Sequence, residues 1–435
     1  MRHVTRAAGP LAALLLAGCY PGPVDPVVVT PPPPFERLPY VQNVSDSAAT
    51  ILWKATGPAG GDTVYVRSVA PDPESGEVPA GASRAWRAVP ADSVARGIRR
   101  ARLEALAPAA PYEYRVSPGG GDLGPWRFRT APAPGMALDP GRTAGGGDTV
   151  RVLLFGDSGW GSDGQLALAR LMNRREWDLA IHVGDVAYED GTERDFTLRH
   201  FLVYGDLLAG VPFFPAVGNH DLHVEDGRPY DLAFEWPAPL PGVRWYSFRW
   251  GPILFVALDT SSPTDDVAGL RRGRGRQYEW LEATLAAAAD DGTIRWTVVF
   301  LHHPLISHAV GLSGHGPDGR LLRTLGPLFE RTGVDLVAAG HDHHYERTYP
   351  VRNGRRVQPG CGYSHVLQGA GGASMHARAV RDAPIVAAGA RRYSFTELRI
   401  TPDRLLGRTI AADGSVIDEF RLVPFAGTED PRCAG

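Results

Sequence analysis

The sequence has no excess of basic residues, no internal repeat and no apolar stretch long enough to cross a membrane. Lysine and arginine total 45 against 48 aspartates and glutamates, which gives a formal net charge of −3. Nucleic-acid-binding domains are usually basic, so this balance argues against such a partner. The apolar run at 11–16 is far shorter than the roughly 20 residues that a membrane helix needs. Glycine and proline are abundant instead (52 and 38), which fits a loop-rich enzyme better than a helical bundle.

The N-terminus has the pattern of an export signal. Arg2 and Arg6 precede the short apolar run, and small residues follow it up to Cys19. Residues 16–19 resemble the lipobox of bacterial lipoproteins, in which the cysteine carries the lipid; the alternative is an ordinary signal peptide with an incidental cysteine. We therefore expect residues 1–19 to be a signal. The protein is then lipid-anchored to the bacterial cell envelope through Cys19, or secreted, and Tyr20 in place of aspartate favours the outer membrane.

Cysteine is scarce, with only 3 in the chain. An exported protein meets an oxidising compartment, so Cys361 and Cys433 are predicted to form a disulfide that ties down the tail at 426–435. The alternative is two free thiols. Residues 20–35 contain a run of four prolines and are expected to form an extended tether.

A chain of 435 residues has room for about two to three domains. Residues 36–131 show short alternating apolar runs separated by turns and no helical periodicity, which predicts an all-β sandwich. Trp53 and the stretch 106–114 resemble a fibronectin type III domain. This region lacks histidine, so we expect a scaffold or interaction module rather than chemistry. The glycine-rich stretch 132–148 reads as a linker.

From residue 149 to 425 apolar strands alternate with helices, which predicts an α/β domain with helices outside a mixed β-sandwich. Expected strands lie at 149–155, 178–183, 211–217, 253–258, 294–301 and 334–339, and expected helices at 165–175, 194–208, 277–289 and 320–332. Beyond 360 further strands follow without helices between them, at 364–367, 393–400, 405–410 and 416–422. These should add an antiparallel part to the sheet.

Polar residues gather where five of these strands end. The loops are rich in Asp, Asn and His, and their candidate ligands are Asp157, Asp185, Tyr188, Asn219, His302, His341 and His343. Open α/β sheets place their sites outside the carboxyl ends of strands. Each loop alone could be an ordinary turn, but five together predict a metal site.

The donor types indicate two metal ions. The Asp185 carboxylate has two oxygens and could bridge two cations roughly 3.5–4 Å apart, the separation used in two-metal phosphate hydrolysis. A set of carboxylates, a phenol and one imidazole suits Fe(III). A set of imidazoles with a neutral amide oxygen suits a softer ion such as Zn(II), Mn(II) or Fe(II).

The order of these motifs resembles the calcineurin-like metallophosphoesterases, and Tyr188 with the fibronectin-like leader narrows the resemblance to the purple acid phosphatases. The resemblance implies that Asp157, Asp185, Tyr188 and His343 bind Fe(III). It implies that Asp185, Asn219, His302 and His341 bind the second metal. It also implies that His220 assists the leaving group, with Asp190 orienting its ring.

Several further residues near these motifs have expected supporting roles. Plant relatives carry a substrate-contacting histidine pair after the His-x-Pro motif, and this sequence lacks an adjacent pair there; either His308 or His315 could substitute. His303 and His344 are expected to support the site rather than bind metal. Asp221 is expected to hold its loop. The basic run 271–276 could steer anionic substrates, or could be a solvated loop.

The resemblance implies a phosphatase that hydrolyses phosphate monoesters by direct attack of a metal-bound hydroxide. Expected substrates are phosphorylated small molecules or phosphoproteins, with no nucleic acid binding and membrane contact only through the lipid. One alternative is a phosphodiesterase or nucleotide pyrophosphatase on the same metals, which the loops 221–245 and 304–318 would distinguish. Another is a non-catalytic surface adhesin or scaffold, but such a protein should have lost ligands, and none is missing.

Overall fold

The fold was analysed in a computed structural model. The structure describes residues 22–28, 30–57, 60–69, 85–118, 122–136, 149–310, 315–375, 379–380, 382–427 and 430–433. The predicted signal peptide with Cys19 and Tyr20 lies outside these residues, as does most of the predicted linker. Within the described part, no helix combines the length and the apolar character that a membrane crossing requires.

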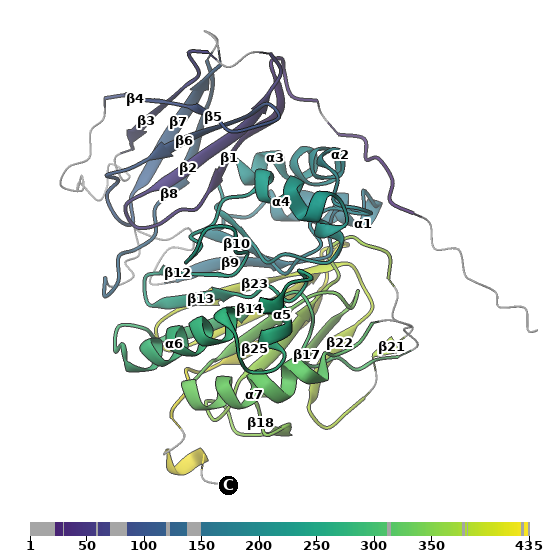
Figure 1. The fold of residues 1–435 in the computed structure, drawn as a ribbon. Coiled ribbons are helices and arrows are strands. Elements are labelled where there is room, and N and C mark those ends of the chain that lie inside the picture. Colours follow the sequence, from purple (N-terminus) through teal and green to yellow (C-terminus); the bar gives the residue numbers. More distant parts are fainter. Residues whose placement is uncertain are drawn as a thin grey trace, which may run out of the picture.

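The N-terminal part is a sandwich of two antiparallel sheets, drawn in purple and blue in Figure 1. The first sheet has the order β1 (Phe35–Gln42), β2 (Ala49–Ala55), β6 (Ile98–Leu103) and β5 (Asp92–Ser93). The second has the order β4 (Arg87–Pro90), β3 (Thr63–Ser68), β7 (Pro111–Ser117) and β8 (Leu123–Arg129). Side chains in β3 alternate between half-buried and buried, as expected for a strand with one face on a core.

Two features confirm a fibronectin type III-like sandwich. Trp53 is fully buried in its core. The Tyr112 hydroxyl accepts a hydrogen bond from the Ala107 amide at 2.7 Å, which is the tyrosine corner of such sandwiches. The sandwich also contacts the second domain through buried tyrosines: Tyr40 donates to the Ala233 carbonyl and Tyr114 to the Ala209 carbonyl.

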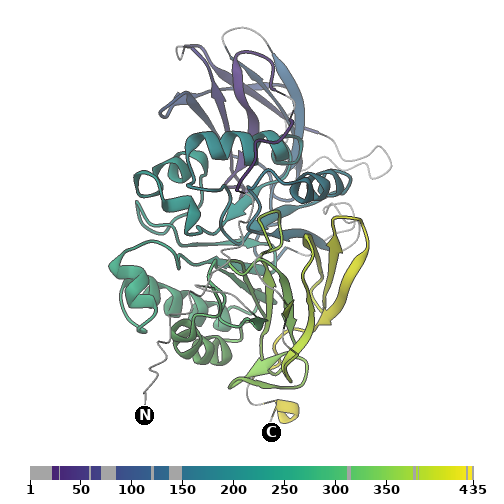
Figure 2. The same cartoon turned by 90° about the vertical axis from the view of Figure 1, so that its right-hand side faces the viewer.

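The second domain packs two mixed sheets against each other, with helices on the outer faces (Figures 1 and 2). The first sheet has the order β11 (Phe213–Pro215), β10 (Leu179–His182), β9 (Val150–Phe155), β23 (Ser394–Ile400), β24 (Leu405–Ala411) and β25 (Val416–Leu422). β9, β10 and β11 are parallel, and the last three strands add the predicted antiparallel part.

The other sheet has seven strands. Their order is β12 (Tyr246–Trp250), β13 (Ile253–Ala257), β14 (Trp296–Phe300), β16 (Leu336–Ala339), β20 (Ser364–Gln368), β17 (Tyr345–Thr348) and β22 (Val386–Ala390). β13, β14, β16 and β20 run parallel to one another. Two small hairpins complete the strands: β15 (Ala309–Val310) pairs with β21 (Ala379–Val380), and β18 (Val351–Arg352) with β19 (Arg355–Arg356).

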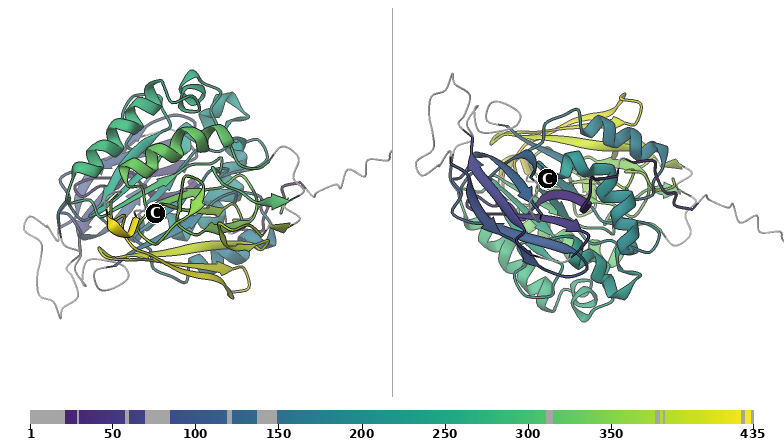
Figure 3. Two further views of the ribbon diagram at one scale, coloured as in Figure 1. Left: turned by 90° about the horizontal axis from the view of Figure 1, so that it is seen from below. Right: turned by 90° about the horizontal axis from the view of Figure 1, so that it is seen from above.

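The helices cover the outer faces of the sheets. Next to the first sheet lie α1 (Asp163–Met172), α2 (Glu193–Phe196), the π-helical turn η1 (Thr197–Phe201), α3 (Leu202–Leu208) and α4 (Arg228–Ala233). Next to the second lie α5 (Asp265–Leu270), α6 (Arg276–Asp290) and α7 (Gly319–Thr332). Figure 3 shows this layering, with the green helices α6 and α7 on one outer face and the yellow antiparallel strands on the opposite side.

Helix ends follow the sequence signals. The Asp318 side chain caps α7 by accepting from the Arg320 and Leu321 amides, and the helix stops at Gly333, whose φ is 73°. The predicted helix at 194–208 is instead interrupted by η1, which sequence periodicity did not reveal. Cys361 and Cys433 form the predicted disulfide, which fixes the short turn η4 (Pro431–Cys433) to the domain.

Candidate metal centre

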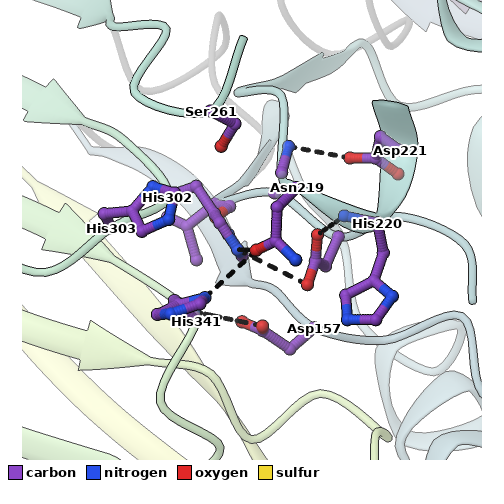
Figure 4. Close-up of polar contacts among 12 residues, drawn as sticks. Asp157, Asn219, His220, Asp221, Ser261, His302, His303 and His341 are labelled. Carbon is purple, nitrogen blue, oxygen red and sulfur yellow. Dashed lines mark hydrogen bonds and ion pairs between the residues drawn. The ribbon is translucent and has the colours of Figure 1, made fainter. Parts of the chain in front are cut away.

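The five polar loops meet at one edge, where the inner parallel strands of the two sheets end. Asp157 follows β9, Asp185 follows β10, Asn219 follows β11, His302 follows β14 and His341 follows β16. Glycines let these loops approach closely. A Cβ on Gly184 would lie 2.5 Å from His302 Nδ1, and one on Gly218 would lie 2.1 Å from Asp185 Oδ1. The edge therefore brings together side chains from both sheets (Figure 4).

The first group of donors surrounds the Tyr188 hydroxyl. It lies 3.1 Å from Asp157 Oδ1, 2.9 Å from Asp185 Oδ2 and 3.1 Å from His343 Nε2. His343 Nε2 is in turn 3.4 Å from Asp157 Oδ1. Two carboxylates, a phenol and an imidazole thus point at one another.

The second group surrounds the Asn219 side-chain oxygen. It lies 3.0 Å from His302 Nε2 and 3.2 Å from His341 Nδ1 (Figure 4). His302 Nε2 is also 3.4 Å from Asp185 Oδ2. Asp185 therefore belongs to both groups, and Asp157, Asp185 and His302 form a candidate metal-binding cluster by ligand-atom distance alone.

Main-chain carbonyls orient two of the imidazoles. His302 Nδ1 lies 2.9 Å from the Val183 oxygen and His343 Nδ1 lies 2.6 Å from the Ser374 oxygen. A carbonyl only accepts, so each Nδ1 carries the proton and each Nε2 of the neutral ring has its lone pair directed into the cluster. On His302 that lone pair faces the Asn219 oxygen, which is another acceptor. Either a proton on Nε2 or a metal ion between the two atoms removes this repulsion, and a set of carboxylate, amide and imidazole donors fits metal ions.

Because the cluster is buried, negative charge on its carboxylates costs free energy unless a cation lies nearby. Asp157, Asp185, Tyr188 and His302 are at most 1% exposed. Burial, with Asp157 and Asp185 nearby, raises the pKa of Tyr188 well above its usual value, so a phenolate there requires a positive charge. Burial also opposes charge on His302, yet the adjacent Asp185 carboxylate outweighs it and raises the pKa of His302 to about 9. Without a metal ion the ring is therefore an imidazolium paired with Asp185, and a bound ion would replace its Nε2 proton.

Three of the converging residues have a left-handed backbone. The φ angles are 53° at Asp157, 53° at Asp185 and 71° at His341. Non-glycine residues adopt this region at a cost, and such residues concentrate at functional sites. Sequence reasoning had no means of finding this feature.

His220 lies beside the cluster, half-exposed. Its backbone amide donates to Asp185 Oδ1 at 2.9 Å, and its ring lies 4.5 Å from the Tyr188 ring. Its Nδ1 donates to the Glu189 carbonyl at 2.6 Å. Asp190, the predicted orienting carboxylate, is exposed and contacts His223 Nδ1 at 3.3 Å instead. Among the described residues, the contacts of Asp190 and His220 are thus with other groups: a main-chain carbonyl one residue earlier holds His220, and backbone atoms leave no sequence signal.

Asp221 holds two loops together. It is fully buried, and its oxygens accept from the Gly218 amide at 2.9 Å, the Val186 amide at 2.9 Å and the Ala187 amide at 3.3 Å. These bonds tie the loop after β11 to the loop after β10. Arg199, which sequence reasoning missed, similarly donates from η1 to the Tyr188 carbonyl and pairs with Asp195.

The remaining histidines divide into two kinds. The His303 ring lies 4.5 Å from the His341 ring between centroids, at a tilt of 44°, and His303 hydrogen-bonds Thr260 Oγ1. The His315 ring lies 4.7 Å from the same His341 ring, at a tilt of 31°. His315 also groups with His341 and Asp342 within ligand-atom distance. His308 instead bonds Glu346 through Nδ1 at 2.7 Å, as does His344 through Nε2 at 3.3 Å. Of the two candidates for substrate contact, His315 lies against the cluster and His308 is turned to Glu346.

Comparison with known proteins agrees with this geometry. Residues 150–345 match the calcineurin-like phosphoesterase family. An uncharacterized protein of Mycobacterium tuberculosis is 29% identical over 357 residues, covering 74% of this chain and 63% of that protein. Human acid phosphatase type 7 is 28% identical over 356 residues, covering 75% of this chain and 77% of its own length.

The fold also has a solved counterpart. The purple acid phosphatase from yellow lupin seeds superposes with a TM-score of 0.71 at 22% identity, covering 88% of this chain and 74% of the lupin chain. Because the match covers 88% of this chain, it extends over both the sandwich and the second domain. Residues 150–345 therefore form a calcineurin-like phosphoesterase domain, and the chain shares the fold of the lupin phosphatase.

Proposed function

We propose that this protein is a binuclear metal-dependent phosphatase that hydrolyses phosphate monoesters by direct attack of hydroxide on phosphorus. The observation that carries the proposal is the convergence of buried lone pairs on two adjoining spots that share Asp185. Relatives named acid phosphatases support the reaction class. Phosphorylated small molecules or phosphoproteins are the proposed substrates, and no nucleic acid partner is expected.

Each of the two proposed metal positions has its own set of donor atoms. Asp157, Tyr188 and His343 with Asp185 supply hard, negatively charged oxygens that suit Fe(III). Asn219, His302 and His341 with Asp185 suit Zn(II), Mn(II) or Fe(II). When bound, the ions would lower the pKa of water and neutralise charge on the phosphoryl group.

The protein groups around the centre would position the reaction. Asp221 fixes the loops that carry Asp185 and Asn219, so the geometry of both spots is set before substrate arrives. His220 is half-exposed at the edge of the cluster with Nδ1 held by the Glu189 carbonyl. In the imidazolium form of His220, the Nε2–H can give its proton to the departing alkoxide, which leaves a neutral ring still bonded through Nδ1. Attack is direct, so no phospho-enzyme forms.

A phosphodiesterase on the same ions is the second enzymatic candidate. The seven donors do not separate it from a monoesterase, because both reactions use the same ions. Initial rates on p-nitrophenyl phosphate and on its bis ester decide between them: the proposal expects faster hydrolysis of the monoester. An inactive scaffold would be indicated by protein that binds metal but hydrolyses neither compound.

Spectroscopy tests the tyrosine spot separately from activity. With Fe(III) bound, Tyr188 should give a visible charge-transfer band, and Tyr188→Phe should remove that band while part of the activity stays. A visible band that survives Tyr188→Phe would refute the assignment of Tyr188.

We also propose that the protein is exported and lipid-anchored through Cys19, with residues 36–131 and 149–425 as its two domains. The Cys361–Cys433 disulfide supports an oxidising compartment. Cys19→Ser should release the protein from membranes prepared from its host. Equal membrane association of both forms would rule out the lipid anchor.

A further inference from the structure

A hollow of about 700 Å³ lies on the outer side of the loop that borders the metal centre. Its wall is formed by 262–265, by the turn after α5 and by the first turn of α7. Three arginines line it, Arg271, Arg272 and Arg320. Ser262 and Thr264, which carry hydroxyl groups, also line the hollow.

The arginines are not equivalent. Arg271 is fixed: its Nε bonds Asp318 Oδ2 at 2.7 Å and its Nη2 bonds the Thr260 carbonyl at 2.8 Å. Arg272 and Arg320 are exposed, and neither side chain has an ion-pair or hydrogen-bond partner among the residues that the structure describes. Asp265 is the one carboxylate among the residues that line the hollow, and Asp318, outside the lining, pairs with Arg271. The hollow therefore carries a net positive charge.

A short chain of contacts connects this hollow to the metal centre. Arg271 bonds the carbonyl of Thr260, and the Thr260 hydroxyl contacts His303 Nδ1 at 3.1 Å. The His303 ring lies against His341. Ser261 is one of the residues drawn around the metal centre in Figure 4, while the next residue, Ser262, lines the hollow. One loop thus has the proposed reaction site on one side and the arginines on the other.

Resting on the proposed function, we propose that this hollow binds a second anionic group of the substrate, remote from the phosphate that is hydrolysed. The preferred substrates are then phosphate monoesters whose alcohol carries a further phosphate or carboxylate several bonds away. Arg272 and Arg320 act as specificity-determining residues, and Arg271 with Asp318 keeps the wall in place. Guanidinium groups suit this role because their forked donors match phosphate and carboxylate oxygens.

A series of bisphosphates of straight-chain α,ω-diols, from two to eight carbons, tests the proposal against the matched monophosphates. The wild-type kcat/KM should favour the bisphosphate over the monophosphate at one range of chain lengths, the length that spans the two sites. In Arg272→Gln/Arg320→Gln this preference should fall by about tenfold, from the loss of two charge-assisted contacts. Hydrolysis of the monophosphates should stay unchanged.

The matched control is Arg274→Gln/Arg323→Gln. Both residues are exposed arginines in the same two segments and neither lines the hollow, so the change in net charge is identical. The control should keep the wild-type preference. An equal loss in both double variants would mean general electrostatic attraction, and the absence of any preference in the wild type would also overturn the inference.

Failure of the proposed function gives a different result, since no monophosphate would then be hydrolysed by the metal-loaded protein. In that case calorimetric titration with 1,6-hexanediol bisphosphate still decides the inference. Weaker binding in the lining variant than in the control supports the anion site. Equal binding in the two variants contradicts it.

Discussion

The sandwich and the metal centre both bury carboxylates, but they compensate them differently. In the sandwich, Asp62 lies 2.8 Å from Arg99, and Glu113 accepts from both Arg67 and Arg127. At the metal centre, Asp157 and Asp185 face a phenol and imidazoles, with no arginine or lysine salt bridge to either among the described residues. A buried carboxylate without such a partner is costly. The difference means that positive charge at the metal centre comes from imidazolium rings in the metal-free protein and would come from metal ions when they are bound to the neutral imidazoles.

The largest effect is expected at the shared carboxylate. Asp185→Asn removes the negative charge that both donor groups use, so bound metal and turnover should fall together, by more than about a hundredfold. Elemental analysis and rates on p-nitrophenyl phosphate measure the two quantities. Full metal content with normal turnover in this variant would show that the Asp185 carboxylate is not needed to bind metal ions.

His220 and Asp190 allow a test of the proton donor within the site. His220→Asn should lower kcat by about a hundredfold, the usual contribution of a proton donor, with metal content retained. Asp190→Asn serves as its control, because Asp190 contacts His223 at the surface rather than His220, and should leave kcat within about twofold. A large loss in Asp190→Asn would restore the role that sequence resemblance assigned to this residue.

In the sandwich, removing a charge should affect stability and not chemistry. Asp62→Asn leaves the Arg99 guanidinium, which is 3% exposed, without its ion pair. The cost should be about 3 kcal/mol of unfolding free energy in urea, with metal content and kcat unchanged. Loss of bound metal in folded Asp62→Asn protein would contradict the separation of the two regions.

The smallest effect concerns pH. Hydrogen bonds from Arg67 and Arg127 lower the pKa of the Glu113 carboxyl. The stabilisation is therefore present above the unfolded-state pKa and is lost as pH falls through the lower, folded-state pKa. Glu113→Gln should cost about 1 kcal/mol at pH 7, because both arginines are partly exposed, and the difference from wild type should shrink toward pH 3 in urea unfolding. A pH-independent difference would mean that packing, not charge, is lost.

Much of the architecture could be predicted because local signals carry it. Apolar runs ending in Gly-Asp or Gly-Asn marked the loops after β9, β10 and β11, and parallel strands bring such loops to one edge. Tyr112, which forms the corner of the sandwich, lies in the stretch 106–114 whose resemblance predicted a fibronectin type III domain. The shared position of Asp185 between two donor groups followed from the same order of motifs.

What could not be predicted depends on main-chain atoms and on distant segments. The Glu189 carbonyl that holds His220, and the Val183 and Ser374 carbonyls that orient two imidazoles, have no residue-type signature. The left-handed backbone at Asp157 and the π-helical turn η1 are likewise set by tertiary packing. The hollow forms where the end of α5 meets the start of α7, through the Arg271–Asp318 pair, so the basic run 271–276 alone could not show which arginines line it.

An anomalous difference map from crystals of metal-loaded protein tests the central claim most directly. The account predicts two peaks on either side of Asp185, one beside Tyr188 and His343 and the other beside Asn219 and His302. A single peak, or none in a correctly folded and active protein, would contradict it.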